Sequence, residues 1–136
     1  MDSVVATLAI IGDRWTLLIL REAFFGVRRF GEMQRNLGVS RTVLSARLKR
    51  LTAGGLFERI AYRQDPVWYE YRLTPKGLDL WPAVVALLQW GDRHLQTAAP
   101  PLRLRHLTCG TAIGAQLVCA SCGDQLRPND TRPERT

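Results

Sequence analysis

Residues 38–51 constrain the fold more than any other segment, because they predict a helix with two unlike faces. A glycine-containing turn leads into Ser40, which is a good helix N-cap. Leu44, Leu48 and Leu51 follow at the i, i+4, i+7 spacing of a buried stripe. The opposite face carries small hydrogen-bonding side chains and cations, with no acid and no large apolar group. It consists of Thr42, Ser45, Ala46 and Lys49, with Ser40 at its start and Arg41 and Arg50 on its flanks.

This outer face suits the major groove of double-stranded DNA, where side chains must reach base edges and phosphates. The alternative is the solvated face of an ordinary amphipathic helix. The charge of the whole chain favours DNA, because its 136 residues carry a formal net charge of +7. A compact basic domain indicates an anionic partner, and nucleic acid is the first one to consider.

The rest of the pattern predicts a mainly α-helical fold with a small β-hairpin wing, the winged helix-turn-helix, followed by a small zinc-ribbon-like segment. We expect helices at residues 4–11, 14–24, 30–37 and 41–53, strands at 56–63 and 68–73, and a long last helix at 75–95. Pro82 lies inside this last helix and should bend it. The predicted organisation is a winged-helix domain at residues 1–95, a linker at 96–101 and a tail at 102–136.

Several short motifs give the chain a family resemblance. They are Gly-Asp-Arg-Trp-Thr at 12–16, Arg-Phe-Gly-Glu-Met at 29–33, Val-Leu-Ser-Ala-Arg-Leu at 43–48, Tyr-Arg-Leu-Thr-Pro-Lys-Gly at 71–77 and Gln-Trp-Gly at 89–91. With these motifs the chain resembles the HxlR-type family of bacterial winged helix-turn-helix regulators. The resemblance implies a homodimeric transcriptional regulator whose first and last helices build the dimer interface. It also implies that the helix predicted at residues 41–53, the recognition helix, enters the major groove and that the wing follows the DNA backbone or minor groove.

One position departs from the family pattern. Many members carry a cysteine just before the first helix, and some use it to sense oxidants or electrophiles. Here Asp2 stands at that place, and no cysteine precedes Cys109. We therefore do not expect a sensor built on an N-terminal thiol, and the sequence identifies no small-molecule effector.

Three further arginines are candidates for DNA contact. Arg63 lies at the predicted wing, and Arg28 and Arg29 precede the third helix, where phosphates run past a helix-turn-helix. Each could equally be an exposed, solvated cation. The last helix carries an apolar stripe larger than one small domain buries, which predicts dimerisation through it. The stripe is Leu78, Trp81, Val84, Val85, Leu88 and Leu95.

The tail repeats one pattern twice: a metal-ligand residue, two others, then Cys-Gly. The first copy begins at His106 and includes Cys109, and the second begins at Cys119 and includes Cys122. Three thiolates and one imidazole would complete a tetrahedral structural Zn²⁺ site, so we expect the four ligand atoms to converge on one point. The alternatives are a metal-free ribbon and a redox pair made by Cys119 and Cys122.

Other function classes find no support in the sequence. No catalytic motif is present, so an enzyme is not expected. The apolar runs are too short to span a membrane and the start lacks the basic residues of a signal peptide, so we expect a cytoplasmic protein. The second hypothesis is a winged-helix protein-interaction module with a zinc-ribbon or redox-active tail. It would need exposed apolar anchors on the outer face of residues 41–53, which the sequence lacks.

Overall fold

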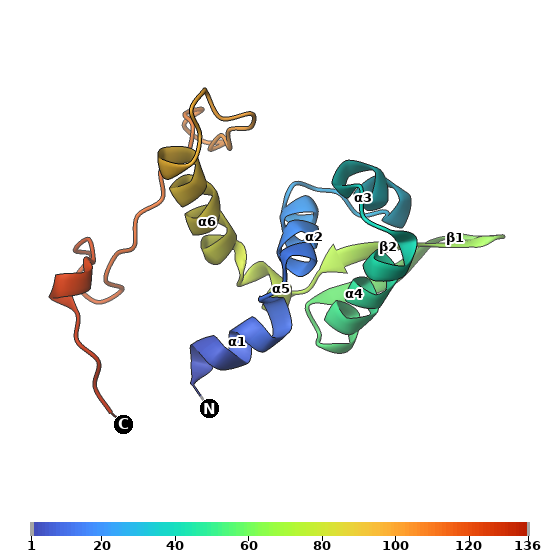
Figure 1. Ribbon diagram of the computed structural model, residues 1–136, viewed down its shortest axis with the longest axis horizontal. Helices are drawn as coiled ribbons and strands as arrows, with labels where there is room; N and C mark the ends of the chain where they lie inside the picture. The colour runs from blue at the N-terminus through green and yellow to red at the C-terminus, as the bar shows by residue number, and fades with distance from the viewer. Residues whose placement is uncertain (1, 136) are drawn as a thin grey trace. The chain divides into compact units, whose positions relative to one another are not determined.

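The computed structural model describes residues 2–135, so residues 1 and 136, which end the two predicted domains, lie outside the described residues. Its elements follow one another along the chain as helices, a hairpin and further helices (Figure 1). They are α1 (Ser3–Ile11), α2 (Arg14–Phe24), α3 (Phe30–Leu37), α4 (Arg41–Ala53), β1 (Phe57–Gln64), β2 (Val67–Leu73), α5 (Pro75–Leu78), α6 (Trp81–His94) and the 3₁₀ turn η1 (Pro128–Asp130). The winged-helix order predicted from the sequence is confirmed.

Polar side chains cap the first turns of α2 and α4. The Asp13 carboxylate accepts the Thr16 amide at the start of α2, at 3.0 Å, and the Ser40 hydroxyl accepts the Val43 amide at the start of α4, at 3.2 Å. Gly38 ends α3 in the left-handed conformation, at φ 63°. These short caps place α3 and α4 at the two ends of a tight turn.

The core lies where α2, α3, α4 and the hairpin meet. Its most enclosed apolar side chains are Ile19, Leu20, Met33, Leu44, Leu48 and Phe57. Leu44, Leu48 and Leu51 of α4 are all buried, which confirms the predicted inner stripe. Because this stripe is fixed against α2, the opposite face of α4 must point outward.

The two strands form an antiparallel hairpin that projects from the helices (Figure 1). Phe57 pairs with Leu73 at its base and Gln64 with Val67 at its tip, with an irregularity between Ala61 and Arg63. The Arg28 carbonyl accepts the Tyr71 amide at 2.7 Å, so the segment before α3 lies along β2. The observed strands differ from the predicted ones by a single residue at each shifted end.

The expected long last helix is wrong in one respect, because the chain forms two helices with a break at residues 79–80. Pro82 is the second residue of α6 rather than an interior residue. A proline has no amide to donate and fits the first turn, where helix amides lack partners in any case. Pro82 therefore starts a new helix instead of bending an old one.

The chain divides into two compact units, residues up to Val84 and residues from Val85 on. The boundary falls within α6, earlier than the predicted boundary after residue 95. The later part of α6 lines a shallow hollow together with tail residues, which explains why it groups with the tail. The lining residues are Leu88, Gln89, Asp92, Pro100, Arg103, Leu104, Ala112 and Ile113.

Among the described residues, no single helix has the length and hydropathy to cross a membrane. The consecutive helices α1 and α2 reach that length only together, and they are bent by 81° at Gly12 and Asp13.

Candidate nucleic-acid interface and metal ligands

The outer face of α4 is exposed over its whole length. Within residues 40–50, which the structure describes in full, this face holds no large apolar side chain. Its exposed members are Ser40, Arg41, Thr42, Ser45, Ala46, Lys49 and Arg50. The structure thus brings the sequence-predicted residues of this helix to one surface, with hydroxyls in the middle and cations around them.

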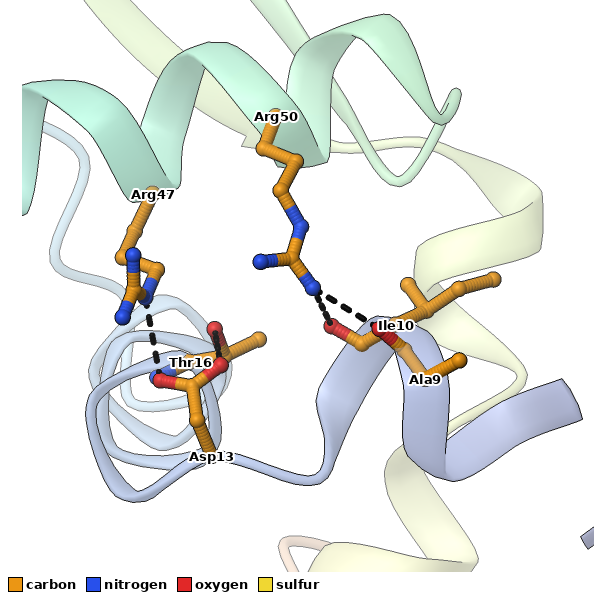
Figure 2. Close-up of polar contacts among 6 residues, drawn as sticks. All are labelled: Ala9, Ile10, Asp13, Thr16, Arg47 and Arg50. Atoms are coloured by element: carbon orange, nitrogen blue, oxygen red, sulfur yellow. Dashed lines mark hydrogen bonds and ion pairs between the residues drawn. The ribbon is translucent and has the colours of Figure 1, made fainter. Parts of the chain in front are cut away.

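Arg50 has a different environment from the others. One of its Nη atoms donates to the carbonyl oxygens of Ala9 at 2.8 Å and Ile10 at 3.4 Å, at the end of α1 (Figure 2). A cation at this end of a helix also interacts favourably with the helix dipole. The Arg50 guanidinium therefore holds α4 against α1, a role that sequence reasoning missed because the two segments are far apart in the chain.

Arg47 makes the second link between α4 and the first helices. Its Nε donates to Asp13 Oδ1 at 3.0 Å, and the Thr16 hydroxyl donates to Asp13 Oδ2 at 2.6 Å (Figure 2). Partial burial raises the pKa of Asp13, but the hydrogen bonds from Thr16 and Arg47 outweigh it and lower the pKa from 3.8 to about 2. The Gly-Asp-Arg-Trp-Thr motif therefore acts structurally, by orienting the helix that carries the outer face.

The wing is lined by arginines stacked on aromatic rings. The Arg63 guanidinium lies 4.5 Å from the Trp68 ring centroid, Arg59 lies 4.1 Å from Tyr69, and Arg29 lies 4.3 Å from Tyr62. Such stacking restrains long side chains while their N–H groups stay available to acceptors. Arg63 and Arg29 were predicted, whereas the role of the rings was not.

A hollow lies between the start of α3, the start of α4 and the wing. Three cations line it, Arg29, Arg35 and Arg41, together with one acid, Glu32, and the rings of Tyr62 and Trp68. Arg41 is also stacked over Phe30, at 5.2 Å. Arg35, Arg59, Tyr62 and Trp68 thus join the candidate surface. The alternation of arginines on β1 with aromatics on β2 was the signal that could have revealed the wing residues.

The backbone carbonyl of Arg28 accepts a hydrogen bond from the Tyr71 amide of β2, and the Arg28 side chain is exposed. Its predicted DNA contact stays a prediction.

Apolar side chains are exposed on two helices. On α1, Val4, Val5 and Leu8 are more than half exposed, and on α6 Leu87 and Trp90 are 57% and 55% exposed. Leu88, by contrast, is half-buried in the hollow beside the tail. The solvent-facing stripe of α6 therefore runs through Leu87 and Trp90 rather than through Leu88.

The two cysteine motifs of the tail fold into the same turn, position by position. In the first, knuckle 1 (residues 104–113), the His106 amide donates to the Thr111 carbonyl at 2.9 Å and the Gly110 amide to the His106 carbonyl at 2.8 Å. In the second, knuckle 2 (residues 117–126), the equivalent bonds join Cys119 to Asp124 and Gly123 to Cys119, both at 2.8 Å. One antiparallel bridge closes each turn, Arg105 with Ala112 and Val118 with Gln125.

The four predicted ligands form two pairs rather than one group. His106 Nδ1 lies 3.4 Å from Cys109 Sγ, and Cys119 interacts with Cys122. Within residues 2–135, however, the structure contains no set of three or more such side chains placed to hold one ion. The expected convergence of all four side chains is therefore not seen in the described residues, and binding of Zn²⁺ stays a prediction.

The three thiols are free, and the surroundings of two of them lower the thiol pKa. Cys109, Cys119 and Cys122 are not joined by disulfides. A hydrogen bond from the Thr111 side chain lowers the pKa of Cys109, and the backbone amides of Cys122 and Ser121 lower the pKa of Cys119. These contacts suit a thiolate that serves as a metal ligand.

Comparison with known proteins gives consistent results. The HxlR-like helix-turn-helix family model matches residues 10–99. The HTH-type transcriptional regulator Rv3095 of Mycobacterium tuberculosis is 52% identical over 134 residues, covering 98% of this chain and 85% of that protein. The crystal structure of PA1607, a transcription factor candidate, has a TM-score of 0.88 at 36% identity and covers 99% of this chain and 95% of its own. The redox regulator HypR in its oxidized form has a TM-score of 0.65 at 31% identity, covering 71% of this chain and 100% of its own.

Proposed function

This chain belongs to the HxlR-like helix-turn-helix family, a family of transcriptional regulators, and we propose that it binds double-stranded DNA as a homodimer. The observation that carries the proposal is the outer face of α4, where hydroxyls and cations are exposed and the leucine stripe behind them is buried. A helix of this kind fits the major groove.

The residues of this surface have two different roles in the proposed complex. Thr42 and Ser45 lie on the outer face of the N-terminal part of α4 and read base edges, because short hydroxyls bond to bases at close range. Arg41, Lys49, Arg29 and Arg63 surround them and contact phosphates, which position the protein without reading sequence. Arg50 is occupied at the end of α1, so its contribution is to orient α4.

The exposed apolar stripes support the homodimer. Val5 and Leu8 of α1 and Leu87 and Trp90 of α6 would be protected from water by a second copy. Two-fold symmetry then sets two recognition helices on half-sites about one helical turn apart.

A DNA-binding assay tests the proposal. Affinity for DNA from upstream of the chain's own gene should fall steeply between roughly 50 and 200 mM salt, because phosphate contacts release counterions. Thr42→Ala or Ser45→Ala should remove roughly 1–3 kcal/mol of discrimination while leaving binding to random DNA nearly unchanged. Arg63→Ala should instead weaken binding to all sequences and reduce the salt slope by about 1.

Two controls complete the assay. Thr97→Ala and Arg132→Ala make the same chemical changes at exposed positions outside this surface and should leave binding unchanged. Equal losses on specific and random DNA for Thr42→Ala and Ser45→Ala would show that another face reads the bases. A flat salt dependence would overturn DNA binding itself.

The dimer has its own test. Leu87→Glu places a charge in the exposed stripe of α6, so it should convert a dimer to a monomer in sizing chromatography without loss of helical circular dichroism. Gln96→Glu adds the same charge at an exposed linker position and should stay dimeric. A folded Leu87→Glu variant that still elutes as a dimer would place the interface elsewhere.

A further inference from the structure

The two knuckles of the tail are alike in their backbone and incomplete in their chemistry. Each has the same hydrogen-bond pattern and ends its ligand turn with a left-handed glycine, Gly110 at φ 75° and Gly123 at φ 80°. Each carries two ligand side chains, of which those of Cys109 and Cys122 are exposed and that of Cys119 is partly buried. A structural zinc ion takes four ligands in tetrahedral geometry, so one knuckle alone supplies only half of a site.

The halves do not meet within one chain. Only residues 114–116 separate the last bonded residue of knuckle 1, Ile113, from the first of knuckle 2, Leu117. Within residues 104–126, all of which the structure describes, no backbone hydrogen bond joins one knuckle to the other. The His106–Cys109 pair and the Cys119–Cys122 pair therefore both stay available to ligands from outside their own knuckle.

Burial of side chains does little to stabilise the tail. None of residues 86–135 is buried, and Leu107 and Leu117 are 96% and 72% exposed. A segment this short that buries so little ordinarily needs a metal ion, a disulfide or a partner chain. Its cysteines are free, which leaves a metal ion and a partner chain.

We propose that the tails of two copies of this chain bind Zn²⁺ between them, with His106 and Cys109 of one copy and Cys119 and Cys122 of the other on each ion. Two-fold symmetry makes the exchange reciprocal, so two copies form two equivalent sites, each with three thiolates and one imidazole. The metal then stabilises the tail and joins the two chains. This inference rests on the homodimer of the proposed function but not on DNA binding.

The first measurement is metal content. The full chain purified without chelator should contain near one zinc ion per chain, and Cys109→Ser and Cys122→Ser should each contain almost none. Ser121→Ala changes an exposed residue between two ligands and should keep the metal. Replacement of zinc by Co²⁺ should give the visible absorption of a tetrahedral thiolate site in the wild type and in Ser121→Ala. A wild-type chain without zinc would overturn the inference.

The decisive measurement mixes the two defective chains. When Cys109→Ser and Cys122→Ser are co-expressed with different affinity tags and purified through both, each mixed dimer should regain one zinc ion. It does so because intact knuckle 1 of one chain faces intact knuckle 2 of the other. If the site lay within a single chain, both chains of the mixed dimer would be defective and no zinc would return, which would overturn the exchange.

The readouts separate this inference from the proposed function. Zinc content is measured without DNA, so loss of DNA binding with restored zinc would leave the inference standing. A monomeric wild-type chain that carries one zinc ion would overturn it. Circular dichroism of both serine variants should match the wild type in helix content, because the helical core lies upstream of the tail.

Discussion

The winged-helix unit and the tail of this protein are stabilised by different means. Up to Val84, Ile19, Leu20, Leu44 and Leu48 are completely enclosed. From residue 86 to residue 135 no side chain is buried, and after α6 ends at His94 the described chain consists mostly of extended segments and short hydrogen-bonded turns. Burial of apolar surface is the main favourable term in folding, so it stabilises the first unit far more than the tail, for which we propose a bound metal ion and a second chain.

The difference has a functional counterpart. The proposed DNA-reading surface needs a rigid support, and α4 is held in place by its buried leucine stripe, by the ion pair of Arg47 with Asp13 and by the hydrogen bonds of Arg50 to the end of α1. A segment that joins two chains can instead become ordered when it binds, so it needs less stability of its own.

The largest expected effect is a direct test of this contrast. Leu48→Ala removes a completely buried side chain from α4 and should lower the free energy of unfolding by about 2–5 kcal/mol. Leu117→Ala makes the same change at a tail residue that is 72% exposed and should change it by less than about 0.5 kcal/mol. Thermal unfolding followed by helical circular dichroism measures both. Similar losses in the free energy of unfolding for the two variants would show that Leu117 contributes to a core as Leu48 does.

How much of this could be predicted from sequence depends on the range of the interaction. Helices α1 to α4 and the hairpin follow from local spacing and caps, and their predicted positions agree with the structure. The break before α6 could not be placed, because Pro82 fits either the interior of a bent helix or the first turn of a new one. The roles of Arg47 and Arg50 depend on contacts with residues that are distant in the chain.

The tail likewise shows which features could not be predicted from local sequence patterns. The motif around Cys109 is repeated around Cys122, and the two copies fold into turns with the same hydrogen bonds. It could not show that the two ligand pairs stay apart within one chain, because that depends on the path of residues 114–116.

A second, smaller effect concerns the junction between the wing and α5. The Thr74 hydroxyl donates to the Gly55 carbonyl and accepts the Gly77 amide at 3.2 Å, which draws Gly77 against the backbone. A Cβ on Gly77 would overlap the carbonyl oxygen of Leu56. Gly77→Ala should therefore destabilise the winged-helix unit by about 1–3 kcal/mol, measured by urea unfolding.

Gly91 provides the matched control for that substitution. It lies within α6, and an added Cβ would meet no atom within 4 Å. Gly91→Ala should be neutral or stabilising by roughly 0.5–1 kcal/mol, because alanine is the better helix former. If Gly91→Ala destabilised the protein as much as Gly77→Ala, the close contact with Leu56 would not be the cause.

The smallest expected effect is the pH dependence that Asp13 gives to the winged-helix unit. Its pKa falls from 3.8 to about 2 on folding, so the unfolded chain takes up this proton first as the pH falls. The stabilisation is complete above about pH 4 and is lost between there and pH 2.

Asp13→Ala should cost roughly 0.5–2 kcal/mol at neutral pH, because it removes the N-cap of α2 and the partner of Arg47. The cost should shrink toward pH 2, where the wild type has lost the same contribution. Glu58→Gln, at an exposed position on β1, should leave the profile unchanged. A variant cost that stays constant from pH 7 to pH 2 would mean that Asp13 acts through its shape rather than its charge, and that Arg47 does not need it to hold α4 in place.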